Sequence, residues 1–400
     1  MRNVSAVRSE PAGGAPGPGE GPPAGGASTP FRFYDNRQKY LAFVNTCNEK
    51  SAVARRAIQE LAHVRPTPPA VRVFDAGMGD ATVLARLMRG MHHTFPTVPM
   101  SVVAKEISLE DVRLGLARMP DRFHEHPATV LVVTNLNYAE APRLMPRDAH
   151  LAAALNWQEV RLVGDSAHQY AEQIEELGAT LAYGWQTKPS AKSGNPTYVR
   201  PSVLVVYRED HKFLLDAVIP KPGRIFENYD LVLASQPWRA RMSADFKAQK
   251  VLAPLVRSLA PGGRLLAIQS AGRDPALEIV QRLWPGENPF QVDRHQLLAA
   301  LKGELGRDAR DFTLTALPDD KAIFRYEMHT LPSEIGNRIG TSTLFAAWNA
   351  AIYVNQIEDE RLDPVVQNGA YLEATQAVLQ KHGGLWFNDE TFVVTRRRSV

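Results

Sequence analysis

The 400-residue chain contains a single cysteine, Cys47, and its charges nearly cancel, with 46 Lys and Arg against 43 Asp and Glu. One cysteine excludes a disulfide within the chain and any zinc site with several cysteine ligands. The charge balance, without a long basic block, disfavours nucleic acid as a partner. The sequence also lacks the run of roughly 20 apolar residues that a membrane span needs, and the apolar segment of a secretory signal. We therefore expect a cytoplasmic protein with no membrane contact.

The first 30 residues differ in composition from the rest. Between Pro11 and Pro30 the chain is mostly Pro, Gly and Ala, with one charged residue, Glu20. Such a segment has almost nothing to bury, so residues 1–30 are predicted to be a disordered tail. Residues 31–70, in which helix formers extend from Arg37 to Ala62, are predicted to contain two short helices.

Strand and helix patterns alternate in the next part of the chain. The apolar run Val71–Phe74 predicts a buried strand, and Ala81–Met91 has apolar residues at helical spacing. The alternation fills residues 71–138 and resumes over 227–400. It predicts an α/β domain whose parallel sheet is covered by helices on both faces.

Two segments break this alternation. Residues 139–226 are too long for one crossover and are predicted to be an α+β insertion after the third strand. Its predicted extended runs are Thr180–Trp185, Ser202–Tyr207 and Phe213–Ile219. A helical insertion is predicted near residues 341–380, before the last strand.

The turn after the first strand carries the clearest chemical signal. The segment from Val71 to Asp80, VRVFDAGMGD, ends a strand in an acid and two spaced glycines. Glycines let the backbone pass close to a ligand, and the helix that follows presents unpaired N–H groups. A dinucleotide-binding turn would place a third glycine or alanine at Thr82. Asp75 would repel a pyrophosphate but suits a cationic amino group. The turn therefore favours S-adenosyl-L-methionine over a nicotinamide dinucleotide.

This segment resembles motif I of the class I S-adenosylmethionine-dependent methyltransferases, in which an apolar strand ends in an acid followed by x-Gly-x-Gly. The resemblance implies a Rossmann-like fold with a seven-stranded, mostly parallel sheet and helices on both faces. It covers the core from about Val71 to Ile268, where Leu259–Leu266 matches the Pro-Gly-Gly turn before the fifth strand. It also implies that residues 31–70 form a lid over the cofactor. We expect the insertion to cap the substrate, because small-molecule sites are usually enclosed.

The implied cofactor site lies at the ends of the first three strands. Glu106 ends the second strand, where an acid can accept two hydrogen bonds from a ribose diol. Asn135 follows the third strand, where a polar residue can bond the adenine amino group. A surface acid and a loop asparagine are the alternatives. The residues predicted to line the cofactor are Asp75, Ala76, Gly77, Met78, Gly79, Glu106, Ile107, Asn135 and Leu136. No metal is predicted, because no acid or cysteine completes a ligand set with the histidine pairs.

The predicted fourth strand ends in Ser235-Gln236-Pro237-Trp238. This resembles the Asn/Asp/Ser-Pro-Pro-aromatic tetrad of amino-group methyltransferases, with Gln236 in place of the first proline. In that family the first residue and an adjacent carbonyl accept hydrogen bonds from the amine, and the aromatic ring packs on it. Ser235, Pro237 and Trp238 are accordingly the predicted catalytic residues, and Trp238 can attract a developing ammonium. A strand-to-loop turn with a core tryptophan is an equally good interpretation.

Together these patterns predict an enzyme that transfers a methyl group from S-adenosylmethionine to a small molecule, at nitrogen, by in-line displacement. Two alternatives stay open: a nucleic-acid or protein N-methyltransferase, and a non-catalytic protein that binds S-adenosylmethionine. Asp75 and Thr82 disfavour a nicotinamide-dependent oxidoreductase. The sequence identifies neither the substrate nor the oligomeric state, so a homo-oligomer stays open.

Overall fold

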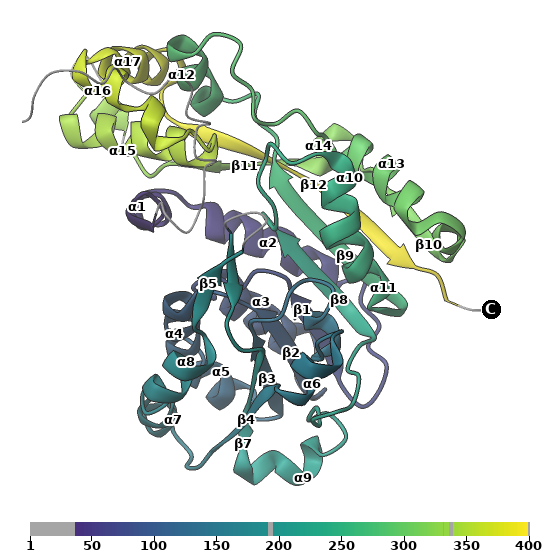
Figure 1. Ribbon diagram of the computed structural model, residues 1–400. Coiled ribbons are helices and arrows are strands. Elements are labelled where there is room, and N and C mark those ends of the chain that lie inside the picture. The colour runs from purple at the N-terminus through teal and green to yellow at the C-terminus, as the bar shows by residue number, and fades with distance from the viewer. Residues whose placement is uncertain (1–36, 191–194, 331, 336–338, 399–400) are drawn as a thin grey trace, which may run out of the picture.

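The computed structural model describes residues 37–190, 195–330, 332–335 and 339–398. The tail predicted over residues 1–30 lies outside them. A central twisted sheet runs through the molecule and is flanked by helices (Figure 1). Within the described residues, no helix has the length and apolar character that crossing a membrane requires.

The central sheet confirms the predicted α/β class. Its strand order is β10-β12-β9-β8-β1-β2-β3-β7-β4, and β11 also pairs with β12. The pairs β9–β8, β8–β1, β1–β2, β2–β3 and β7–β4 are parallel, whereas β3–β7 and the three pairs of β12 are antiparallel. The strands are β1 Val71–Asp75, β2 Met100–Lys105, β3 Thr129–Thr134, β4 Asn156–Leu162, β7 Ser202–Arg208, β8 Tyr229–Ser235, β9 Leu259–Ser270, β10 Phe312–Thr315, β11 Ile323–Glu327 and β12 Trp386–Arg396.

The predicted count of seven strands is wrong, because the described residues form a central sheet of ten strands. Two of the additional strands, β4 and β7, belong to the insertion and extend the sheet beyond β3. Every residue of β7 is buried, so this strand needs neighbours on both sides, and β3 and β4 supply them. At the other end, β10 and β11 pair with successive parts of the long strand β12.

Two extended runs predicted within the insertion are also wrong. Thr180–Trp185 lies mostly in helix α8 (Gly178–Gly184). Leu181 and Trp185, which directly follows the helix, are four residues apart and both buried, because this spacing places them on one face of a helix. Phe213–Ile219 begins inside the short helix α9 (Lys212–Leu215), and Phe213 is 98% exposed. Leu215 and Val218 of the same run are buried in the core, so the run packs through these two residues without forming a strand. The run Ser202–Tyr207 is confirmed as β7.

Helices cover both faces of the sheet because strand side chains alternate between them. Val73 and Val102 pack into one core with α2, α3, α4, α5 and α7, and Phe74 and Val103 pack into the other with α10, α11 and α13. The bounds are α2 Glu49–Leu61, α3 Thr82–Thr94, α4 Leu109–Ala117, α5 Pro120–Glu125, α7 Ala167–Glu175, α10 Ala244–Lys247, α11 Ala253–Arg257 and α13 Arg294–Leu305, with a π-helical segment at Ala248–Leu252 between α10 and α11.

A third core joins helices from both ends of the described chain. It packs α1 against α15, and α12 against α15 and α17. In Figure 1 these helices lie together beyond the ends of β11 and β12, with the purple α1 below the yellow-green group. Their bounds are α1 Arg37–Thr46, α12 Pro275–Leu283, α15 Thr341–Val354 and α17 Ala370–His382; the remaining short helices are α6 Ala149–Ala153, α14 Asp319–Ala322 and α16 Asp363–Gln367.

One edge of the sheet collects the carboxyl ends of the parallel strands. The glycine turn follows β1, Glu106 follows β2, and Ser235 ends β8. Ligands of open α/β sheets bind at such an edge. The long strand β12 runs antiparallel, so its beginning lies at the same edge, with Asp389 opposite Ser270.

Candidate functional site

The glycine turn is held by the acid that precedes it. The Gly77 N–H donates to Asp75 Oδ1 at 3.1 Å. Asp75 is only 2% exposed, and this burial raises the pKa of its carboxyl to about 6, although the Gly77 hydrogen bond opposes the rise. Gly79 has φ +52°, a left-handed conformation in which other residues are strained. The turn thus combines a buried acid with a glycine that its backbone requires.

Gly77 has a different reason to be glycine. Its φ is not positive, and among the described residues a Cβ built on it would meet only the Ser235 carbonyl oxygen, at 4.0 Å. Protein atoms therefore leave room beside Gly77, on the side that faces the cavity. That room is what a ligand passing close to the backbone needs.

Glu106 connects the glycine turn to the next helix. Its Oε2 accepts the Gly79 N–H at 2.8 Å, and its Oε1 accepts the N–H groups of Ile107 and Ser108 at 2.7 and 2.9 Å. An ionised carboxylate has about four acceptor positions, so about one remains, on Oε2. Glu106 can therefore accept one ribose hydroxyl in this arrangement, whereas the sequence predicted two.

A cavity of about 1470 Å³ lies over this edge of the sheet. That volume exceeds the roughly 300–1,000 Å³ of ordinary small-molecule pockets, so it has room for a cofactor and a second molecule. The sequence-predicted residues that line it are Ala76, Gly77, Gly79, Glu106, Ile107, Ser235, Pro237 and Trp238. The structure thus brings together the predicted cofactor turn and the predicted catalytic segment, although they are about 160 residues apart in sequence.

Four predicted cofactor residues do not line the cavity. Asp75, Met78, Asn135 and Leu136 are all buried behind it. Asp75 acts on the turn through Gly77, as described above, and Met78 packs beside Gly115 of α4.

The side chain of Asn135 makes its hydrogen bonds to the insertion. Its amide donates to the carbonyl oxygens of Gly184 and Arg200 at 3.0 and 2.9 Å, and its Oδ1 accepts the Ser202 N–H at 2.8 Å. Three hydrogen bonds therefore tie the end of β3 to the insertion. The geometry does not support the predicted bond from Asn135 to adenine.

The Ser235–Trp238 segment departs from the tetrad at Gln236, and the backbone explains why. Gln236 has φ +49°, which a proline ring cannot adopt. Its side-chain amide donates to Ser270 Oγ and Asp389 Oδ1, both at 3.1 Å, and its Oε1 accepts the Ser270 N–H. Gln236 thus connects the end of β8 to β9 and β12.

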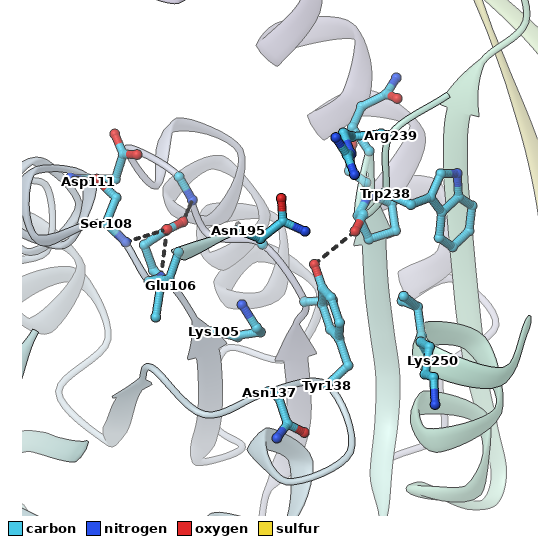
Figure 2. Close-up of a pocket in the computed structure, with 18 of the residues that line it drawn as sticks. Lys105, Glu106, Ser108, Asp111, Asn137, Tyr138, Asn195, Trp238, Arg239 and Lys250 are labelled. Atoms are coloured by element: carbon cyan, nitrogen blue, oxygen red, sulfur yellow. Dashed lines mark hydrogen bonds between the residues drawn. The ribbon is translucent and has the colours of Figure 1, made fainter. Parts of the chain in front are cut away.

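Trp238 lines the cavity but is mostly enclosed. It is 6% exposed, and its indole N–H donates to Gln269 Oε1 at 3.0 Å. The Pro237 carbonyl oxygen accepts the Tyr138 hydroxyl at 2.9 Å (Figure 2). Both contacts fix the position of this segment at the cavity wall.

Residues from α1 and α2 form another wall. Tyr40, Phe43, Glu49 and Lys50 line the cavity, and Lys50 Nζ lies 3.5 Å from a carboxylate oxygen of Glu49 and 5.4 Å from the centre of the Tyr40 ring. Burial lowers the pKa of Lys50, but Glu49 and Tyr40 outweigh it, so the pKa lies well above its usual value. Lys50 is therefore charged at this wall.

Sequence patterns missed two central residues, Lys105 and Tyr138. Lys105 is the last residue of β2, and its ammonium lies 4.7 Å from the centre of the Tyr138 ring. In Figure 2 both point into the space between Glu106 and Trp238. The signal for Lys105 was a lysine directly after three buried apolar residues of a strand; nothing in the local sequence distinguishes Tyr138.

The described residues include no cluster of three or more His, Cys, Asp or Glu side chains that could hold a metal ion. Two histidines, His92 in α3 and His126 directly after α5, do meet: their Nδ1 atoms are 2.9 Å apart. His126 Nε2 is hydrogen-bonded to the Val98 carbonyl oxygen, so the two histidines are attached to the backbone through His126.

Comparisons with known proteins assign no family, because no family model and no curated protein match the chain. Among solved structures, StiE O-MT is 12% identical with a TM-score of 0.34, over 88% of this chain and 74% of that one. Geranyl diphosphate methyltransferase in complex with SAM is 11% identical with a TM-score of 0.32, over 86% and 85%. The cyclase SpnF is 11% identical with a TM-score of 0.33, over 94% and 100%. At such values the function has to be argued from the site.

Proposed function

We propose that this chain is a class I S-adenosylmethionine-dependent methyltransferase that acts on a small molecule. One observation carries the proposal: the glycine turn, with its buried acid and with Glu106 attached to it, opens onto a cavity that the Ser235–Trp238 segment also lines. A cofactor at the turn and a substrate at that segment would share one cavity.

The residues of the turn fit S-adenosylmethionine. The space beside Gly77 would admit the methionine part, and the remaining acceptor position on Glu106 Oε2 suits a ribose hydroxyl. Glu106 at the cavity wall and Asp75 behind the turn would supply negative charge near the sulfonium and ammonium groups of this ligand. The same acids disfavour the pyrophosphate of a nicotinamide dinucleotide.

When bound, the cofactor supplies an electrophilic methyl group. The chain's own contribution is orientation: Glu106 and the turn fix one reactant, and the Ser235–Trp238 segment fixes the other. Holding two reactants in line converts a bimolecular step into one within a complex, a gain of up to about 7–11 kcal/mol. The cavity walls from α1 and α2 help to exclude water from this space.

For the acceptor atom we propose nitrogen. Ser235 and Pro237 line the cavity at the position of the amine-binding tetrad, and the Trp238 ring forms the wall beside them. Gln236 stands where the tetrad has a proline, and its φ of +49° sets the direction of the backbone at this point. Single-turnover methyl transfer to matched amine and hydroxyl acceptors would test this assignment; faster transfer to the hydroxyl compound would contradict it.

For the insertion we propose a substrate-capping role. Ala139, Arg147, Asn195 and Pro196 from residues 139–226 line the cavity, while β4 and β7 of the same segment extend the sheet. The variants Arg147→Ala and Asn195→Ala should raise the KM for the acceptor and leave the affinity for the cofactor unchanged. An unchanged acceptor KM in both would contradict a cap.

The proposed function is tested by calorimetric titration of the full chain with S-adenosylmethionine, S-adenosylhomocysteine and NAD⁺. We expect both sulfur compounds to bind at one site and NAD⁺ not to bind. Binding of NAD⁺ alone would refute the proposal. Methyl transfer to any acceptor separates an enzyme from a protein that only binds the cofactor.

A further inference from the structure

The charged residues that line the cavity are not evenly distributed. Four acids come from the start of α2 and from the β2–α4 junction: Glu49, Glu106, Glu110 and Asp111. They share that part of the wall with two cations, Lys50 and Arg113. Lys105, the residue before Glu106, lies at the boundary of this part. The rest of the lining contains four cations and one acid: Arg147, Arg239, Lys250, Arg257 and Glu304. In Figure 2, Glu106 and Asp111 lie to the left, Lys105 in the middle, and Arg239 and Lys250 to the right.

Lys105, at the boundary of the cationic part, is the residue whose surroundings indicate a negatively charged ligand. Apart from the Tyr138 ring, the described residues give its ammonium no hydrogen bond and no carboxylate within 4.0 Å. Burial lowers the pKa of Lys105, and the charge of Glu106 only partly opposes this. Lys105 is half-buried, and a cation that is partly removed from water gains from a partner that compensates its charge. The side of Lys105 that faces the cavity is where such a partner can bind.

The walls around this part of the cavity also describe the body of the ligand. Tyr138, Trp238, Met242, Val251 and Pro254 present aromatic and aliphatic surface close to the cationic residues. A molecule with an apolar body and one negative group would satisfy both kinds of surface. A cationic molecule would meet Lys105, Arg239 and Lys250 with like charge.

We propose that the acceptor substrate is an organic oxyanion, a carboxylate or a phosphate on an apolar body that carries the accepting nitrogen in uncharged form, and that Lys105 binds the negative charge. This inference rests on the proposed function, because it takes the cationic part of the cavity as the acceptor side. The positively charged cofactor would then lie at the acidic part and the negatively charged acceptor at the cationic part. The two would attract each other across the cavity.

Matched probes test the charge requirement on protein saturated with S-adenosylhomocysteine. Calorimetry would compare 3-phenylpropionate and phenyl phosphate with the neutral 3-phenylpropionamide and the cationic 3-phenylpropylamine. A charge-assisted contact is worth about 1.5–3 kcal/mol, so at least one acid should bind about tenfold or more tightly than the amide. Which acid binds better tells a carboxylate from a phosphate acceptor.

Three variants connect this preference to one residue. Lys105→Met keeps an unbranched side chain on Tyr138 but removes the charge, and it should abolish the preference. Lys105→Arg should retain most of it, and Lys302→Met, on an exposed position of α13 outside the cavity, should retain all of it. An unchanged affinity for S-adenosylhomocysteine in Lys105→Met would show that the site is folded.

Equal affinity for acid and amide, no binding of either acid, or tighter binding of the amine would overturn the proposal. So would an acid preference that persists in Lys105→Met. The proposed function fails in a different way: the chain would not bind S-adenosylhomocysteine, while the acid preference, measured without it, would remain.

Discussion

A substitution at Gly77 should distinguish a residue needed for folding from a residue needed for ligand binding. Its φ is not positive, and in the part of the chain that the structure describes a Cβ added there would meet only the Ser235 carbonyl oxygen, at 4.0 Å. The protein alone therefore does not require glycine at this position. A ligand that passes over the backbone, as we propose for the cofactor, would require it.

The magnitudes for Gly77→Ala follow from this geometry. Replacing glycine by alanine in an unstrained conformation stabilises a protein by about 0.4–1 kcal/mol, so the melting temperature should stay the same or rise slightly. Placing a methyl group in space that the cofactor occupies should cost about 1–3 kcal/mol, as overpacking of a core does. That corresponds to a roughly 5- to 150-fold loss of affinity for S-adenosylhomocysteine.

Two further alanine variants complete the assay by calorimetry and thermal melting. Gly79→Ala places alanine at φ +52°, so it should lose about 1–2 kcal/mol of stability. Gly303→Ala, at an exposed position of α13 with no atom within 4 Å of the added Cβ, should leave the affinity unchanged. Wild-type affinity in folded Gly77→Ala would refute the placement of the cofactor.

Further predictions concern residues around the same turn. In Glu106→Gln the side-chain NH2 group would face backbone N–H donors. The free energy of unfolding measured in urea should therefore fall by about 1–3 kcal/mol, and cofactor binding measured by calorimetry should weaken. Burial raises the pKa of Asp75 from 3.8 to about 6, so the affinity for the cofactor should fall as the pH drops through 6 in the wild type but not in Asp75→Asn. Because the folded protein holds this proton more tightly than the unfolded chain, the contribution of Asp75 to the free energy of unfolding should become more favourable as the pH falls from about 6 to 4. Asn135→Ala removes three buried hydrogen bonds and should lose about 2–4 kcal/mol, while the folded fraction keeps its cofactor affinity; a selective loss of that affinity would restore an adenine role. Tyr138→Phe removes the bond to the Pro237 carbonyl, so in steady-state kinetics it should lower kcat more than it changes the cofactor Kd.

Features that depend on residues close together in the sequence could be predicted from the sequence. The strand Val71–Asp75, the glycine turn and Glu106 form a contiguous or nearly contiguous pattern, and the structure places them as expected at one sheet edge. The strand count could not be predicted in this way. Whether β7 joins the main sheet depends on its antiparallel pairing with β3, and such pairing leaves no mark on the alternation of strands and helices.

The same distinction holds for the site. The hydrogen bonds of Asn135 go to Gly184, Arg200 and Ser202, which lie 49 to 67 residues away, so no local pattern reveals that its amide is occupied. The contact between Lys105 and Tyr138 likewise forms only when β2 and the segment after β3 are placed side by side. Long-range packing decided these roles.

A crystal structure of the full chain with S-adenosylhomocysteine tests the central proposal most directly. The proposal predicts the methionine part beside Gly77, a ribose hydroxyl within hydrogen-bond distance of Glu106 Oε2, and the sulfur facing the Ser235–Trp238 segment. The ligand bound elsewhere in the cavity, with the glycine turn unoccupied, would contradict it.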